Sequence, residues 1–135
     1  MEAHTGPDEQ AIRDVISKWH RATIDGDIDS VLELVAEDVV FLVAGQPPMT
    51  GRSAFERGLR SLLETHHIES THDVREVSVA GDMAWAWTEL TVRIVSTPGG
   101  EVAARTGHAL SILHRQDDGR WLVFRDANLL GPATP

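Results

Sequence analysis

The chain has 135 residues, of which 41% are hydrophobic and 24% charged, a composition that suits one folded domain and differs from that of disordered chains. A formal net charge of -9 disfavours binding to nucleic acid or to anionic membrane surfaces. With no cysteine, no signal-peptide pattern and no apolar stretch long enough for a membrane span, we expect a cytoplasmic protein that uses neither disulfides nor thiolate chemistry.

The first half of the chain predicts helices. Thr5 and Asp8 form a candidate capping box for a first helix that should end at Asp25 and Gly26. Its apolar stripe has three- and four-residue spacing and consists of Ile12, Val15, Ile16, Trp19 and Thr23. Asp27 can cap a second, shorter helix whose stripe reaches Val35.

A strand and a third helix are predicted next. The β-branched run at 39–43 favours a strand, and Pro47 and Pro48 should end it. Ser53 and Glu56 form a second candidate capping box. The helix that follows has an apolar stripe of Phe55, Leu59, Leu62 and Leu63.

From about Thr71 the hydrophobic period changes to two, which predicts four strands. They contain Val77 and Val79, then residues 85–95, 102–113 and 121–129. Short glycine-containing turns separate them, so neighbouring strands should pair antiparallel as a meander. Helices followed by a meander indicate a single α+β domain over 8–130, with flexible tails at 1–7 and 131–135.

Both faces of the predicted sheet contain apolar residues. Ala84 and Ala86 alternate with Trp85 and Trp87. We expect the two tryptophans at the outer face, and the alternative is that they line the pocket. Helices can cover only one face, so we expect a homodimer through the outer one.

Several short motifs carry a family resemblance: 25–27 (DGD), 36–41 (AEDVVF), 51–54 (GRSA), 80–84 (AGDMA) and 118–121 (DGRW). The pattern resembles SnoaL-like members of the nuclear transport factor two-like superfamily and is most similar to the SgcJ/EcaC group. The resemblance implies a cone-shaped, curved antiparallel sheet wrapped around three N-terminal helices, with a small-molecule pocket between them. Enzymes and non-catalytic binding proteins share this fold, so the fold alone does not assign an activity.

Residues at positions that match better-known relatives limit which reaction mechanism and which kind of guest the resemblance implies. Trp19 and Val43 occupy the positions of the tyrosine and aspartate of ketosteroid isomerase, so that mechanism is not inherited. Leu90, Ser111 and Asn128 match arginines in the association domain of calmodulin-dependent kinase. The resemblance therefore implies a less cationic pocket with an apolar guest.

Two residues are candidate acid/base groups. Asp126 shares a strand phase with Leu122, Phe124 and Asn128 that the resemblance directs into the cavity, where apolar neighbours would raise its pKa. The alternative is a surface ion pair between Asp126 and an arginine such as Arg105. His72 could shuttle protons at the pocket mouth, or could be a partly exposed histidine bonded to backbone.

The expected pocket lining draws on helices, strands and a loop, and the alternative for the apolar members is an ordinary core. The predicted ligand-binding residues are Trp19, Phe41, Val43, Met49, Phe55, Leu59, Thr88, Leu90, Ser111, Phe124 and Asn128. We expect no metal, because the histidines lack ligand spacing. No cofactor is expected either, because nucleotide-binding loops are absent, and the oxidoreductase label of the SgcJ/EcaC group has no support in the residues.

Together these features predict a protein that binds an apolar, polyketide-like molecule. Acid/base isomerisation, cyclisation or dehydration in natural-product tailoring is the leading hypothesis. A non-catalytic binding or shielding protein and a dimeric protein-interaction adaptor are the alternatives. The adaptor would have a filled interior without a cavity.

Overall fold

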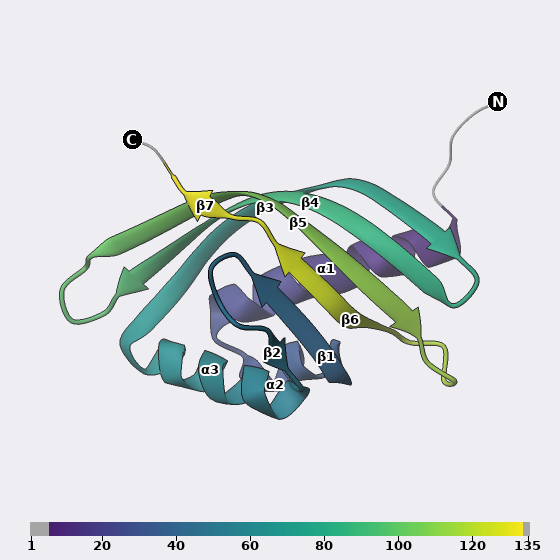
Figure 1. The fold of residues 1–135 in the computed structure, drawn as a ribbon, viewed down its shortest axis with the longest axis horizontal. Helices are drawn as coiled ribbons and strands as arrows, with labels where there is room; N and C mark the ends of the chain where they lie inside the picture. The colour runs from purple at the N-terminus through teal and green to yellow at the C-terminus, as the bar shows by residue number, and fades with distance from the viewer. Residues whose placement is uncertain (1–5, 134–135) are drawn as a thin grey trace.

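The computed structural model describes residues 6–133. In chain order, their elements are α1 (Pro7–Asp25), α2 (Ile28–Leu32), β1 (Val35–Val43), β2 (Met49–Thr50), α3 (Arg52–Thr65), β3 (His66–Ala80), β4 (Met83–Ser96), β5 (Val102–Arg115), β6 (Trp121–Asn128) and β7 (Gly131–Pro132). Figure 1 shows a curved sheet that arches over α1, with α2 and α3 beyond it. This is the predicted α+β architecture. Within 6–133, no helix is both long and apolar enough to cross a membrane.

The ends of α1 follow from the local sequence. Pro7 occupies the start of the helix, where its missing N–H costs nothing. Gly26 ends the helix in the left-handed conformation, with φ of 71°, so the predicted end is confirmed. The N-cap residue is Gly6, without a side-chain cap, and Thr5 of the expected capping box lies outside the described residues.

Asp27 caps α2 as predicted. Its carboxylate accepts hydrogen bonds from the Ser30 backbone N–H at 3.2 Å and from the Ser30 hydroxyl at 2.7 Å. The helix ends at Leu32, so the prediction that it reaches Val35 was wrong. Val35 instead begins β1, where this β-branched side chain is fully buried and pairs with Val123.

Glycine rather than a side chain sets the start of α3. Gly51 is the N-cap residue, with φ of 93° and ψ of 146°, and no side-chain hydrogen bond caps the helix. The capping box predicted from Ser53 and Glu56 is therefore wrong. Glu56 pairs with Arg60 at 2.8 Å, one helical turn later.

The sheet has the strand order β2-β1-β6-β5-β4-β3. Strands β3 to β6 form the predicted antiparallel meander. β1, however, pairs with β6 in parallel, so the sheet is mixed and the expectation of a purely antiparallel sheet needs correction. The mixed pairing matters because it brings the end of β1 beside the end of β6.

Pairing extends the sheet beyond two predicted limits. β3 begins at His66 rather than near Thr71, since pairing with β4 starts at His66 and Ser96. Gly131 and Pro132, expected in a tail, pair with β5 as β7. Residues 1–5 and 134–135 of the expected tails lie outside the described residues.

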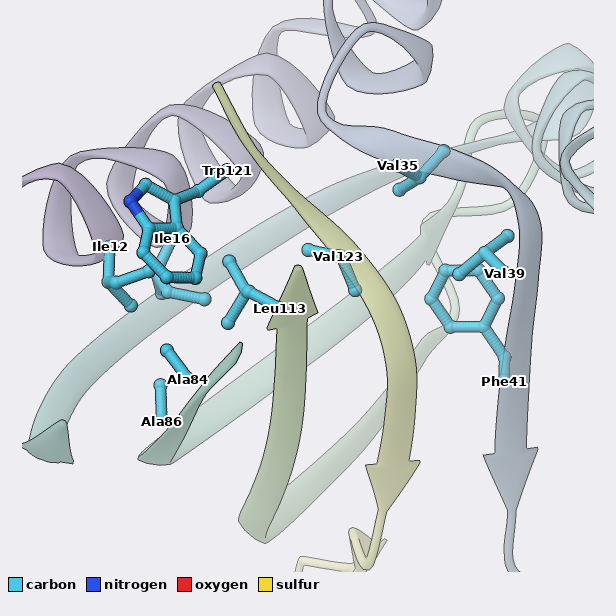
Figure 2. Packing of buried hydrophobic residues seen from close by; sticks show 10 residues of the cluster. All are labelled: Ile12, Ile16, Val35, Val39, Phe41, Ala84, Ala86, Leu113, Trp121 and Val123. Carbon is cyan, nitrogen blue, oxygen red and sulfur yellow. The ribbon is translucent and has the colours of Figure 1, made fainter. Parts of the chain in front are cut away.

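The core lies between α1 and the concave face of the sheet. Its main cluster, drawn in Figure 2, consists of Ile12, Ile16, Val35, Val39, Phe41, Ala84, Ala86, Leu113, Trp121 and Val123. The small side chains of Ala84 and Ala86 are nearly or fully buried, whereas Trp85 and Trp87 on the opposite phase are more than a third exposed. The inward phase of β4 is therefore the alanine phase.

Candidate functional site

Two adjoining hollows open beside Trp19 on the concave face. We call the larger the outer chamber, of about 370 Å³, lined by Trp19, Phe41, Val43, Gln46, Pro47, Met49, Phe55, Asp126 and Asn128. We call the smaller the inner recess, of about 80 Å³, lined by Ile16, Trp19, His20, Thr88, Leu90, Ala109, Ser111, Asp126 and Asn128. Since Trp19, Asp126 and Asn128 line both, the two hollows form one site. The outer chamber alone falls in the range of roughly 300–1,000 Å³ typical of small-molecule sites.

Parallel pairing of β1 with β6 builds the outer chamber. It sets Phe41 opposite Asp126 and Val43 opposite Asn128. Phe41 stacks on Phe55 from α3 with ring centroids 4.5 Å apart, and Trp19 from α1 meets Phe41 edge-on at 6.0 Å. The chamber therefore has aromatic walls, and β6 contributes the polar side chains of Asp126 and Asn128 to its lining.

Antiparallel register across β4, β5 and β6 builds the inner recess. Thr88, Ala109 and Asn128 are paired in one row across the three strands, and Ser111 pairs with Asp126 two residues along. Because side chains alternate between faces, both rows point to the concave side. The recess is therefore lined by polar groups from adjacent strands.

Asp126 is the buried carboxyl group at the junction of the two hollows. The residue is 6% exposed, and the Ser111 hydroxyl donates a hydrogen bond to its Oδ1 at 2.6 Å. Burial raises the pKa of Asp126 to about 6, against a smaller opposing effect of the Ser111 hydrogen bond. The alternative ion pair with Arg105 is wrong, because the Arg105 guanidinium donates to the Leu130 carbonyl at 2.9 Å.

His20 is a second ionisable group in the recess, and sequence reasoning missed it. Burial lowers the pKa of His20 to about 4, with a further contribution from His72. The ring is therefore neutral at physiological pH. His20 lies one helical turn after Ile16, which itself lies one turn after Ile12, so the four-residue spacing was the signal that could have found it.

His72 lies behind His20 rather than in the wall of the site. The two rings stack with centroids 4.1 Å apart and planes inclined by 6°. Desolvation lowers the pKa of His72, although Asp73 opposes the shift. Neither hollow is lined by His72, so the structure does not bring the two predicted acid/base residues together in one cavity.

Two other predicted ligand-binding residues lie elsewhere. Leu59 is buried in a separate core cluster with Ala22, Val31 and Ile68. Phe124 stacks on His114 with centroids 3.8 Å apart and lines neither hollow. The register between β5 and β6 shifts after Ile112, so Phe124 does not share the phase of Asp126 as predicted.

The remaining predicted ligand-binding residues do line the site: Trp19, Phe41, Val43, Met49, Phe55, Thr88, Leu90, Ser111 and Asn128. The lining also includes Ile16, Gln46, Pro47 and Ala109, which were not among the predicted ligand-binding residues. Within the described part of the chain, no three histidine, aspartate or glutamate residues are grouped as a metal site would need.

A larger hollow of about 450 Å³ lies at the turn between β4 and β5. Exposed turn residues such as Pro98, Gly99 and Glu101 line it, and no buried acid or aromatic side chain faces it. Size alone does not make a reactive site, so we assign the chemistry to the outer chamber and the inner recess.

Comparison with known proteins gave a family and several similar folds. A family model for the SnoaL-like domain matches residues 16–124. A conserved protein from Planctomyces limnophilus DSM 3776 is 35% identical, with a TM-score of 0.88 over 93% of this chain and 98% of that one. A search of curated proteins found no match.

Two more distant structures share the fold. A ketosteroid isomerase-like protein from Erwinia carotovora atroseptica SCRI1043 is 19% identical, with a TM-score of 0.82 over 96% of this chain and 99% of that one. A hexachlorocyclohexane dehydrochlorinase (LinA) of type 2 is 14% identical, with a TM-score of 0.78 over 94% of this chain and 89% of that one. At these identities the likeness concerns the fold alone.

Proposed function

Because the chain belongs to the SnoaL-like domain family, we propose that it binds an apolar small molecule in the outer chamber and transfers a proton with Asp126. One observation carries this proposal: a buried carboxyl group with a pKa of about 6 lies where the aromatic chamber meets the polar recess. A group whose pKa is close to the working pH can both accept and donate a proton efficiently.

Each neighbour of Asp126 has a role in this proposal. The Ser111 hydroxyl holds one carboxyl oxygen and so orients the other. The aromatic walls of Trp19, Phe41 and Phe55 position the guest and exclude water. His20 is neutral and can donate or accept a hydrogen bond on the opposite side of the recess.

The reaction class that fits is isomerisation, cyclisation or dehydration, each of which needs a proton moved next to an apolar skeleton. Two proteins of this fold are named for an isomerase and a dehydrochlorinase, which supports proton-transfer chemistry on this scaffold. The proposal also includes membership in the SgcJ/EcaC group and polyketide-like substrates, which the short sequence motifs support. It includes a cytoplasmic location, which the lack of cysteine and of a signal-peptide pattern supports.

Non-catalytic binding is the second candidate function. The observation that favours it is the position of His72 behind His20, which leaves Asp126 without the predicted catalytic partner. Binding needs only the aromatic chamber. A protein-interaction adaptor is less well supported, because that function predicted a filled interior.

A homodimer through the convex face of the sheet is part of the same proposal. Met83, Trp85, Trp87 and Leu110 on β4 and β5 are each more than a third exposed. Ion pairs border them, including Arg75 with Glu89 at 3.1 Å and Arg93 with Glu69 at 2.7 Å. An apolar centre with a charged rim is the usual anatomy of a protein interface.

The proposed catalysis can be tested without knowing the natural substrate. 5-Nitrobenzisoxazole opens its ring when a base removes one proton, and a carboxylate in an apolar pocket suffices for that step. We expect the wild type to accelerate the reaction, with a rate that rises as pH passes through about 6. Asp126→Asn should lower the rate at least about 100-fold while the probe still binds, since general-base catalysis contributes roughly 10²–10⁴-fold.

The control is Ile24→Glu, a change at an exposed position of α1 that lines neither hollow. Its rate should equal that of the wild type. Binding of the probe without any acceleration by the wild type would contradict catalysis and favour the binding protein.

A further inference from the structure

The Thr88 hydroxyl is a buried polar group that nothing in the described chain satisfies. Thr88 is 3% exposed, and its Oγ1 has no hydrogen-bond partner. It faces the inner recess, where the neighbouring walls from Leu90 and Ala109 are apolar. Leaving such a group unpaired is costly, so the observation indicates that a partner enters the recess from outside.

The other polar groups of the recess define what that partner can be. Asn128 Oδ1 already accepts from the Leu130 backbone N–H at 2.9 Å, which leaves the side-chain amide of Asn128 as a donor. Asp126 Oδ1 is bonded to Ser111. A guest oxygen would therefore meet the Thr88 hydroxyl and the Asn128 amide, beside the free oxygen of Asp126.

Size and charge restrict the guest further. A recess of about 80 Å³ has room for about two or three water-sized groups, since a water molecule occupies about 30 Å³ in the liquid, and is too small for a ring. Among residues 6–133, no lysine or arginine lines either hollow, and the carboxylate of Asp126 repels an anion. Desolvation in the recess, which lowers the pKa of His20, also penalises a guest cation and opposes its attraction to the Asp126 carboxylate.

We propose that Thr88 is the specificity-determining residue of the site, and that it selects an apolar ring molecule bearing one neutral hydroxyl or carbonyl oxygen. The ring occupies the outer chamber, and the oxygen enters the inner recess and bonds to Thr88 Oγ1. The inference rests on the proposed small-molecule function and adds the chemical class of the guest.

Thr88→Val tests this directly, because valine keeps the shape of threonine and replaces its hydroxyl with a methyl group. The probes are 2-naphthol, naphthalene, 2-naphthoate and 2-(aminomethyl)naphthalene, with dissociation constants from chemical-shift titration of ¹⁵N-labelled protein. The wild type should bind 2-naphthol about tenfold more tightly than naphthalene, the ratio that one net hydrogen bond provides. Thr88→Val should lose most of this preference, and the part that remains is the contribution of the Asn128 amide.

Two controls keep the result interpretable. Thr91→Val removes a hydroxyl of β4 that bonds to Thr106 outside the site, and should preserve the preference for 2-naphthol. Thr88→Val should melt no lower than the wild type, because it removes a buried group without a partner.

The outcomes separate the inference from the proposed function. Unchanged binding of 2-naphthol by Thr88→Val, or tighter wild-type binding of the naphthoate or the amine, would overturn the role of Thr88 while leaving a small-molecule site in place. If the wild type bound none of the four probes, both the inference and the proposed function would fail.

Discussion

Asp126 and His20 line the same recess, and burial shifts their pKa values in opposite directions. The pKa of Asp126 rises from 3.8 to about 6, and that of His20 falls from 6.5 to about 4. In both cases the neutral form is favoured, because desolvation penalises charge of either sign. The recess is therefore an uncharged polar environment at mildly acidic pH.

These shifts predict how Asp126 affects stability. The pKa of Asp126 is raised in the folded state. Its contribution to the free energy of unfolding is therefore most favourable below pH 3.8 and is lost as pH rises through about 6. Asp126→Asn should therefore be more stable than the wild type at pH 8, by up to about 3 kcal/mol for a shift of about two pKa units. The gain should disappear near pH 4. Chemical denaturation at both pH values measures it.

His20 should affect the pH dependence of stability with the opposite sign. Because its folded pKa is depressed, its contribution is present above pH 6.5 and is lost as pH falls through about 4. His20→Asn should therefore lose less stability than the wild type on acidification from pH 6.5 to 4. An Asp126→Asn variant whose stability relative to the wild type is the same at pH 4 and 8 would contradict the buried carboxyl group.

The sequence found Asp126 and missed His20 for one physical reason. A lone acid in an apolar strand phase is conspicuous, whereas a histidine on a helix is unremarkable until the helix is docked. α1 packs against β3, and only that contact brings His20 onto His72 and into the recess. The four-residue spacing after Ile16 indicates that His20 lies on the inward face of α1, but it does not indicate which residues of the sheet His20 meets.

At the scale of elements, the hydrophobic period predicted most helices and strands, but several details depended on pairing. Val35 continued a helical stripe in the sequence, yet it is a strand residue because Val123 pairs with it. Phe124 left the predicted phase because the register of β5 and β6 shifts after Ile112. The parallel contact of β1 with β6 also could not be derived from turns, since no short turn connects them.

The start of α3 provides a prediction at this scale. Gly51 has φ of 93°, a region that disfavours any residue with a Cβ atom. Gly51→Ala should destabilise the protein by about 1–3 kcal/mol and shift the chamber wall at Phe55, which lies four residues later. Urea denaturation measures the loss.

Gly58→Ala is the matched control within the same helix. Its added Cβ would meet the flexible end of Met49 at 3.4 Å, and alanine is the better helix former. This variant should be stabilised by up to about 1 kcal/mol. Equal effects of the two substitutions would show that the conformation of Gly51 is not what starts α3.

At the scale of the whole molecule, the sequence predicted the α+β fold and a covered second face, and it favoured Trp85 and Trp87 for that outer face over a place in the pocket. The structure assigns Trp85 and Trp87 to the convex face, where the Trp87 indole donates to His108 Nδ1 at 2.9 Å. In the part of the chain that the structure describes, the helices lie on the concave side of the sheet (Figure 1). The convex face is thus the surface available to a second copy.

Trp87→Glu should weaken the proposed dimer, because a carboxylate in the apolar centre would be desolvated without a partner. Sedimentation equilibrium at micromolar concentration should give a dimer for the wild type and a larger monomer fraction for the variant. Ile24→Glu, at an exposed position of α1 away from the sheet, should remain dimeric. A wild type that is monomeric throughout would refute the dimer without affecting the pocket.

The central claim is that Asp126 is a buried acid/base group with a pKa near neutrality, and its carboxyl carbon reports this directly. In ¹³C-labelled protein, the side-chain carbonyl resonance of Asp126, assigned by its loss in Asp126→Asn, can be followed from pH 3 to 9. We predict a titration midpoint at about pH 6. A midpoint at or below about 4, the ordinary value for an exposed aspartate, would contradict the account.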